Sequence, residues 1–181
     1  MLNDTDFLHI IAATPLVSID LILRDERGAV LLGQRLNKPA QGFWFVPGGR
    51  IWKNERVAEA LKRISQRELG VTIAEGELLG VFDHIYPDNF LGAPDVNTHY
   101  VVLGLAAAWP VGATITADDQ HGELRWWTVE ALLASEVVHE NTKAYFRLQV
   151  GSSRLAAAFN SQPSVLNSSI NHFADDSGQR D

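Results

Sequence analysis

Residues 54–69 constrain the fold most, because they have the sequence of one helix placed directly after a glycine turn. Their sequence, NERVAEALKRISQREL, consists mainly of strong helix formers, Asn54 suits the N-cap, and Gly70 follows the last helical position. The turn PGG at residues 47–49 leads into this helix. Glycine lets backbone groups approach a ligand that a side chain would exclude. We therefore expect a ligand where the turn meets the helix.

Glu68 is the residue of this helix that most needs a partner. On a repeat of about 3.6 residues, Val57, Leu61, Ile64 and Glu68 lie in one row, so the carboxylate shares the apolar face. Taking a carboxylate out of water is costly unless it is paired, hydrogen-bonded or bound to a cation. Two alternatives remain open at this point: Glu68 faces a cleft, or a frayed last turn lets it reach solvent or an arginine.

The remaining elements alternate between strands and helices. The segment LVSIDLIL is apolar at nearly every position, which suits a strand in a sheet that is covered on both faces, and a charged turn ending at Gly28 leads into the second strand of a hairpin. This order predicts a mixed α/β domain over residues 1–150. We expect a short helix over 4–12, strands over 16–23, 29–34, 78–86, 99–107 and 123–127, and further helices over 129–134 and 141–150.

Beyond Gly151 the composition shifts to Ser, Asn, Gln and Asp. We expect residues 151–181 to be a loosely attached polar tail with one short helix around residues 154–159. For the whole chain of 181 residues, 46% hydrophobic and 20% charged residues allow a sizeable core. The chain should therefore fold as one domain with an appendage.

The charge balance and the missing cysteines exclude several classes of function. With 15 Lys and Arg against 22 Asp and Glu, the net charge of −7 repels a nucleic-acid polymer. The absence of cysteine removes disulfides, cysteine nucleophiles and thiolate zinc sites. The first residues lack the basic flank of a secretory signal, and no apolar run approaches the roughly 20 residues that span a bilayer. We expect a soluble cytoplasmic protein with no membrane role.

The glycine turn and the helix together resemble the Nudix box, whose usual pattern is G-x5-E-x7-R-E-U-x-E-E-x-G-U, where U is a bulky aliphatic residue. Six of the nine set positions agree, namely Gly49, Glu55, Arg63, Glu68, Gly70 and Val71. Three differ, namely Ile64, Ser65 and Arg67. The resemblance implies an α/β/α sandwich of the Nudix type with a mixed sheet, and a ligand at this helix.

The differences remove two of the three usual metal-binding carboxylates, at Ile64 and Arg67. One glutamate can still hold a Mg²⁺ ion that keeps several waters and shares substrate phosphates, but not a multi-metal cluster. A box with one retained glutamate resembles the GDP-mannose mannosyl hydrolase branch of the Nudix family. The likeness covers much of residues 5–148, including TPLVSID, LLGQR, PAQGFWFVPGGR, DNF, THYVVLG, DDQHGELRW and ALLASEVVH.

The resemblance implies a role for each site residue. The Gly48 carbonyl, Glu68 and Gln120 would hold one Mg²⁺ per subunit, with Mn²⁺ as an alternative. His121 would be the general base that activates water for attack on the anomeric carbon with inversion. Arg35 and Arg50, catalytic and substrate-binding at once, would bind the diphosphate. Sugar or phosphate would be held by Asp20, His84 and Tyr100. Phe7 would contact the base across a homodimer.

From the local sequence alone, each of these residues also has an ordinary explanation. Arg35 fits a solvated strand end, Arg50 a charge at the approach to a helix, and His121 an exposed loop histidine. Tyr100 fits core packing with a satisfied hydroxyl, and His84 a strand cap. Phe7 fits core packing. For all of these residues, it is the resemblance to the family that favours a functional role.

The expected function is Mg²⁺-dependent hydrolysis of GDP-mannose to GDP and free hexose. GDP-glucose remains an alternative substrate, because an epimeric hydroxyl is recognised by tertiary geometry. A phosphoanhydride hydrolase of a nucleoside diphosphate derivative is a second alternative, which the missing carboxylates argue against. A nucleotide-sugar binding module without turnover is the third.

Overall fold

The computed structural model describes residues 3–115 and 121–147 of the 181-residue chain. These residues belong to the first of two units, residues 1–148. Gln120, the expected tail over residues 151–181 and the expected helix around residues 154–159 lie outside the described residues. The domain boundary near residue 150 therefore stays a prediction. No helix in the described part of the chain is long and apolar enough to cross a membrane.

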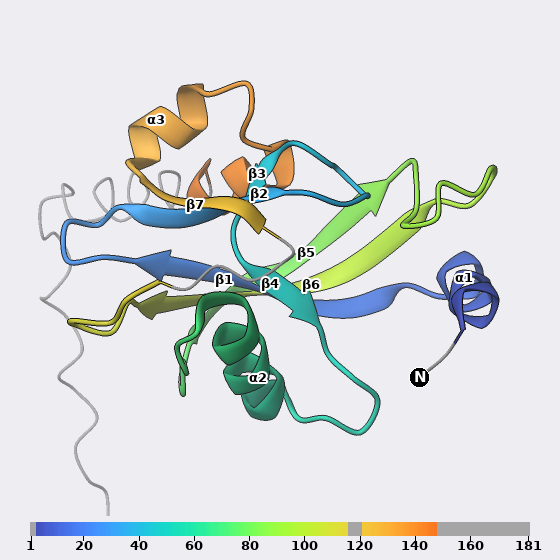
Figure 1. Cartoon of the computed structure of the whole chain (residues 1–181), viewed down its shortest axis with the longest axis horizontal. Helices are drawn as coiled ribbons and strands as arrows, with labels where there is room; N and C mark the ends of the chain where they lie inside the picture. Colours follow the sequence, from blue (N-terminus) through green and yellow to red (C-terminus); the bar gives the residue numbers. More distant parts are fainter. Residues whose placement is uncertain (1–2, 116–120, 148–181) are drawn as a thin grey trace, which may run out of the picture. The chain divides into compact units, whose positions relative to one another are not determined.

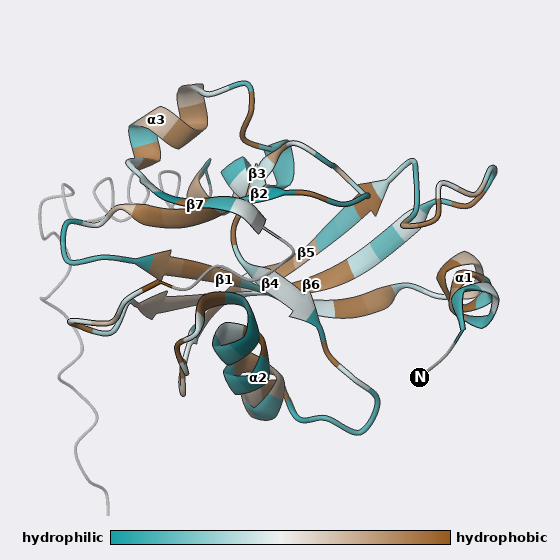
Figure 2. Ribbon diagram, in the orientation of Figure 1, coloured by the Kyte–Doolittle hydropathy of each residue, from teal (hydrophilic) through white to brown (hydrophobic). Residues whose placement is uncertain are grey.

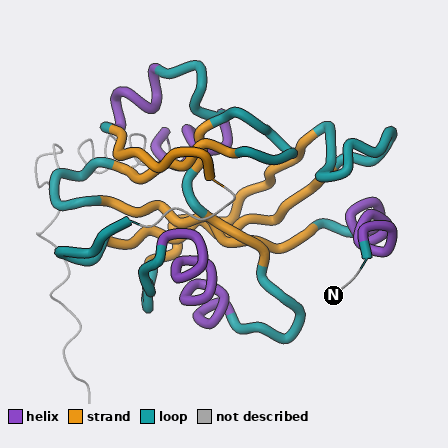
Figure 3. Tube along the Cα trace, viewed as in Figure 1, coloured by secondary structure: helices purple, strands orange, loops and turns teal. Residues whose placement is uncertain are grey.

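The described residues form one seven-stranded mixed sheet, shown in Figures 1 and 3. Five strands follow in the order β3-β2-β1-β6-β5, while β4 pairs with β1 and β7 pairs with β2. The β1–β6 pair is parallel and the other pairs are antiparallel. The strands are β1 (Leu16–Arg24), β2 (Val30–Arg35), β3 (Trp44–Phe45), β4 (Gly48–Arg50), β5 (Glu77–Tyr86), β6 (Thr98–Ala108) and β7 (His121–Trp127).

Helices cover both faces of the sheet, with α2 on one side and α3 on the other (Figure 1). The helices are α1 (Asp4–Ala13), α2 (Val57–Leu69) and α3 (Val129–Ala134), and residues 140–147 are also helical. The predicted α/β class is confirmed. Residues 148–150 of the helix predicted over 141–150 lie outside the described residues.

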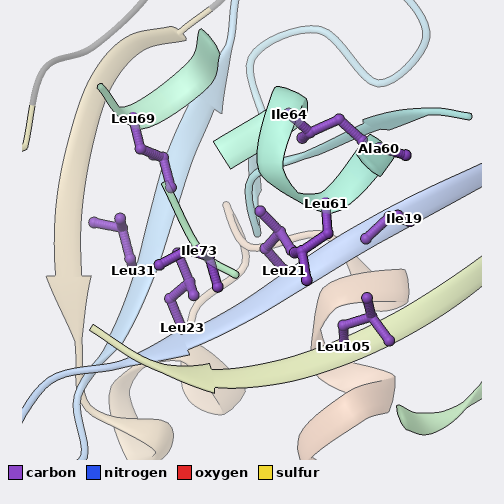
Figure 4. Close-up of a cluster of buried hydrophobic side chains, with 10 residues drawn as sticks. All are labelled: Ile19, Leu21, Leu23, Leu31, Ala60, Leu61, Ile64, Leu69, Ile73 and Leu105. Atoms are coloured by element: carbon purple, nitrogen blue, oxygen red, sulfur yellow. The ribbon is translucent and has the colours of Figure 1, made fainter. Parts of the chain in front are cut away.

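Strand β1 is apolar at most positions because its two faces enter two separate cores. Ile19 and Leu21 pack with Leu61 and Ile64 of α2 in one buried cluster, shown in Figure 4. Ile22 points to the opposite face and joins a second buried cluster. That second cluster also contains Leu132 of α3 and Phe146 of the segment 140–147. The hydropathy colouring in Figure 2 shows the hydrophobic central strands and the hydrophilic outer surface of α2.

The start of α2 differs from the prediction. The helix begins at Val57 rather than Asn54, because Asn54 has φ +68°, a left-handed conformation that cannot enter a helix. Arg56 is the N-cap, and Glu59 accepts a hydrogen bond from the Arg56 backbone N–H at 3.0 Å. Val57, which the row of apolar residues placed in the core, is exposed. The predicted glycine end is confirmed, because Gly70 is left-handed with φ 71°.

Two short strands were not predicted. The aromatic run supplies β3, which pairs with β2, and the glycine pair lies in β4, which pairs with β1, rather than in an isolated turn. The expected helix at residues 4–12 is present as α1, but Asn3 is its N-cap instead of Asp4 or Thr5. Strand positions predicted from period and composition shift by one or two residues at their ends.

Candidate active site

A cavity of about 270 Å³ lies where β4 passes between β1 and α2. Its walls come from β1, β2, β4, β5, β6 and α2, so residues far apart in the sequence meet here. Seven of the residues singled out by sequence analysis line it, namely Asp20, Arg35, Gly48, Arg50, Glu68, His84 and Tyr100. The sheet therefore brings most of the predicted site into one place.

Glu68 is buried, with 5% of its surface exposed, and it faces this cavity rather than bulk solvent. Its Oε2 accepts a hydrogen bond from the Gly48 backbone N–H at a long 3.4 Å. A side chain at Gly48 would not fit, because a Cβ there would stand 2.5 Å from the Ile19 carbonyl oxygen and 2.7 Å from Asp20 Oδ1. The glycine lets β4 pass close enough to β1 to place its backbone beside Glu68.

The two replaced box positions behave differently. Ile64 is buried under the glycine strand, with its Cγ1 3.3 Å from where a Cβ of Gly49 would stand, so hydrophobic packing takes the place of a carboxylate. Arg67 lines the cavity and adds a positive charge. Within residues 3–115 and 121–147, no group of three or more His, Cys, Asp or Glu residues is placed to hold a metal ion. Of the box carboxylates, only Glu68 remains in this wall, which suits a single hydrated divalent ion better than a metal cluster.

Of the arginines lining the cavity, Arg63 is committed to the protein. Its Nε and Nη2 donate to the two oxygens of Glu55 at 2.6 and 2.7 Å, and Nη2 also donates to the Arg50 carbonyl at 2.8 Å. The guanidinium lies 3.8 Å from the centre of the Trp52 ring. Arg63 thus holds the loop that joins β4 to α2, and it is not available to grip a ligand.

Arg35 and Arg50 each lie over an aromatic ring. The Arg35 guanidinium lies 5.4 Å from the Phe45 ring centre, and that of Arg50 lies 4.2 Å from the Phe7 ring centre. Cation–π contact orients a guanidinium and leaves its N–H groups able to bind an anion. Its contact with Arg50 places Phe7 beside a residue that lines the cavity. Phe7 also packs against Phe90 with ring centres 5.1 Å apart and is in neither buried cluster.

Asp20 and His84 meet Tyr145, which was not singled out from the sequence. The Tyr145 hydroxyl donates to Asp20 Oδ2 at 2.7 Å and lies 3.3 Å from His84 Nε2. Burial raises the pKa of Asp20 to about 6, although the Tyr145 hydrogen bond and Arg35 oppose the rise. Burial lowers the pKa of His84 to about 4, so the imidazole is neutral at pH 7. Burial likewise raises the pKa of the Tyr145 hydroxyl, which stays protonated.

Two further tyrosines line the cavity. Burial raises the pKa of Tyr86 to about 12 and also raises that of Tyr100, so both hydroxyls remain neutral donors. Tyr86 Oη accepts a hydrogen bond from Asn141 Nδ2 at 3.2 Å. A large polar aromatic residue near the end of a predicted strand was the only sequence signal for Tyr86.

The two predicted residues of the loop before β7 are only partly placed. The backbone of His121 pairs with Arg35 across β7 and β2, which brings this residue beside a cavity residue. Its side chain and all of Gln120 lie outside the described part. Their roles therefore stay predictions.

Comparison with known proteins identifies the family. A family model described as the NUDIX domain matches residues 14–148, and the chain belongs to the Nudix family. It is a Nudix hydrolase, of a class that acts on nucleoside diphosphate derivatives.

Individual relatives agree with this assignment. The chain is similar to the low-salt glycan biosynthesis protein Agl8 of Haloferax volcanii, with 42% identity over 125 residues, covering 67% of this chain and 76% of that protein. An ADP-ribose pyrophosphatase of Methanocaldococcus jannaschii is 28% identical over 139 residues, 76% of either chain. The solved MutT protein from Methanosarcina mazei Go1 has a TM-score of 0.65 at 20% identity, over 78% of this chain and 98% of that one, and shares the fold.

Proposed function

We propose that this Nudix hydrolase cleaves a GDP-sugar, with GDP-mannose as the first candidate and GDP-glucose as the second, into GDP and a free hexose. The observation that supports the proposal is that one part of the cavity wall is positively charged and another part is neutral or acidic. Arg35 and Arg50 supply positive charge and form no ion pair within 4.0 Å among the described residues, whereas Asp20 and His84 supply neutral or acidic groups. A diphosphate suits the arginines, and a hydroxylated sugar suits the other two residues.

The donor set fits a hydrated Mg²⁺ ion, with Mn²⁺ as the alternative. Gly48, Glu68 and Gln120 would hold one ion per subunit, and the ion would offset the charge that develops on the departing diphosphate. Glu68 supports this assignment because it is a buried carboxylate facing a polar cavity. Such a group is more stable with a cation nearby.

The residues of the chain then have separate tasks. Arg35 and Arg50 bind the diphosphate and stabilise the leaving GDP. His121 takes a proton from the water that attacks the anomeric carbon, which inverts the configuration. Asp20, His84 and Tyr100 hold the hexose. Phe7, whose ring centre lies 4.2 Å from the Arg50 guanidinium of its own chain, contacts the base across the homodimer.

The similarity to an ADP-ribose pyrophosphatase favours a second candidate, hydrolysis of a phosphoanhydride bond. Reaction in ¹⁸O-labelled water separates the two chemistries. Label in the hexose supports the first proposal, and label in a phosphate product overturns it. GDP-mannose, GDP-glucose, ADP-ribose and plain GTP form the substrate panel, each tested with Mg²⁺.

A His121→Ala variant tests the proposed base and the third candidate, a binding module. We expect a rate about a hundredfold to ten thousandfold below that of the unmodified chain, the usual effect of losing a general base. His9→Ala is the matched control, because His9 lies in α1 and does not line the cavity. If the chain binds GDP-mannose but releases no more GDP than His121→Ala, the binding module is correct.

The assembly and location proposed for the enzyme are a homodimer in the cytoplasm. Light scattering coupled to size-exclusion chromatography tests the dimer, and a mass of 20.0 kDa in solution would refute it. The polar tail over residues 151–181 is proposed to be dispensable for hydrolysis. A chain ending at residue 150 that loses GDP release would contradict that boundary.

A further inference from the structure

The carboxylate of Asp20 occupies the middle of the sheet between two glycines. Asp20 in β1 pairs with Gly48 in β4 on one side and with Gly104 in β6 on the other. A Cβ at Gly48 would stand 2.7 Å from Asp20 Oδ1, and a Cβ at Gly104 would stand 3.0 Å from Phe82 Cε2 and 3.1 Å from Tyr145 Cε1. One glycine therefore makes room for the acid, and the other for the tyrosine that binds it and the ring packed on that tyrosine.

Packing alone holds the ring of Tyr145 in place, apart from any hydrogen bond of its hydroxyl. It packs edge-on against Phe82 with ring centres 4.6 Å apart, and the residue is 1% exposed. The helical segment 140–147 carries this ring to the face of the sheet opposite α2. Little freedom is left for the hydroxyl except rotation of its proton.

The Tyr145 hydroxyl joins Asp20 and His84 into one group of contacts. Asp20 Oδ2 accepts the proton of this hydroxyl at 2.7 Å. The Tyr145 oxygen also lies 3.3 Å from His84 Nε2, and His84 Nδ1 lies 3.9 Å from Asp20 Oδ2. Tyr145 therefore sets how both side chains stand in the cavity wall.

We propose that Tyr145 is a positioning residue which, by holding Asp20 and His84, fixes the two side chains that receive the hydroxyl groups of the substrate's sugar. This inference rests on the proposed function and specifies how the same cavity recognises the hexose. An ionised carboxylate such as that of Asp20 accepts hydrogen bonds, so it favours a group that brings hydrogen-bond donors. A phosphate brings acceptors only and is directed to the arginines instead.

The test compares binding of GDP-mannose with binding of GDP, which lacks the sugar. Tyr145→Phe keeps the ring against Phe82 and removes only the hydroxyl. We expect the affinity for GDP-mannose to fall about tenfold, as for the loss of one hydrogen bond to a charged group, and the affinity for GDP to stay within about twofold. Calorimetry in EDTA measures both without metal-dependent turnover.

Thr142→Val is the matched control. Its hydroxyl is also buried in the segment 140–147, but it has no hydrogen-bond partner among the residues that the structure describes, so its removal should change neither affinity. Gly104→Ala is the second variant, because its methyl group would stand 3.0 Å from Phe82 Cε2 and 3.1 Å from Tyr145 Cε1 and would displace this packed pair of rings. It should weaken GDP-mannose binding without weakening GDP binding.

Failure of this inference is separate from failure of the proposed function. Equal changes in GDP and GDP-mannose affinity in Tyr145→Phe, or no change in either, overturn the positioning role. Absence of GDP release from GDP-mannose by the unmodified chain with Mg²⁺ overturns the proposed hydrolysis. The first result comes from binding alone and the second from turnover alone.

Discussion

Replacing Glu55 by glutamine should show how strongly the loop between β4 and α2 is held. Glu55 Oε1 accepts from Arg63 Nε at 2.6 Å, and Oε2 accepts from Arg63 Nη2 at 2.7 Å and from the Trp52 backbone N–H at 2.9 Å. Glutamine keeps the shape, but it removes the charge and places an amide donor against other donors. The side chain is only 12% exposed, so water cannot fully replace these bonds.

The expected magnitude follows from these contacts. A hydrogen bond to a charged group contributes about 1.5–3 kcal/mol, so the substitution should lower the free energy of unfolding by about 2–4 kcal/mol. For a chain of this size, Tm should fall by about 4–16 °C. Urea unfolding followed by circular dichroism measures the change directly.

The matched control is Glu123→Gln, which breaks an exposed pair with Arg125. The two side chains of that pair are 51% and 54% exposed, and such a pair contributes about 0–1 kcal/mol. The Arg63 hydrogen bonds hold the pKa of Glu55 below its ordinary value of 4.5. The stability from Glu55 is therefore complete above that value and is lost as pH falls through the lowered pKa. Equal losses in the two variants at pH 7 would refute the reasoning.

Three further predictions concern packing and protonation. Gly48→Ala should destabilise the chain more than Gly49→Ala. A Cβ at Gly48 would stand 2.5 Å from a backbone oxygen, whereas a Cβ at Gly49 would stand 3.3 Å from a flexible side chain. The reverse order of stabilities in a denaturant titration would contradict this prediction. Leu132→Ala, at a fully buried position, should lower the free energy of unfolding by about 2–5 kcal/mol, whereas Val137→Ala, at an exposed position, should lower it far less. Similar losses of Tm in the two variants would be evidence against a packed core around Leu132. Folding lowers the pKa of His84 from its ordinary 6.5 to about 4, so the unfolded state binds the proton first and the free energy of unfolding falls as pH decreases from 6.5 to 4. His84→Gln should make the free energy of unfolding less dependent on pH in this range. An unchanged pH dependence would refute this prediction.

The helix α2 and the inward side chain of Glu68 could be predicted because helix periodicity is local. Strong helix formers, a terminal glycine and a row of apolar residues leave few alternatives over one segment. The exact start could not be predicted, because Asn54 takes a left-handed conformation within a loop that Arg63 and Glu55 hold. Three-dimensional contacts override a favourable cap residue in this case.

The contact between Tyr145 and Asp20 shows what local patterns cannot reveal. These residues are 125 positions apart in the sequence. Each has an ordinary explanation by itself, because Tyr145 could be any buried ring and Asp20 any polar residue that interrupts an apolar strand. Only the packing of segment 140–147 on the sheet brings them within hydrogen-bond distance. Similarly, β3 and β4 are too short to leave a periodic signal.

The close approach of Gly104 to the Tyr145 ring restricts how this chain can diverge. A methyl group at position 104 would stand 3.0 Å from Phe82 Cε2 and 3.1 Å from Tyr145 Cε1, so it would compete with both rings for volume. Descendants that acquire a larger residue at position 104 should therefore carry a smaller or displaced residue at position 82 or 145. Position 104 should vary together with these two positions, although β6 and the last helical segment are distant in the chain.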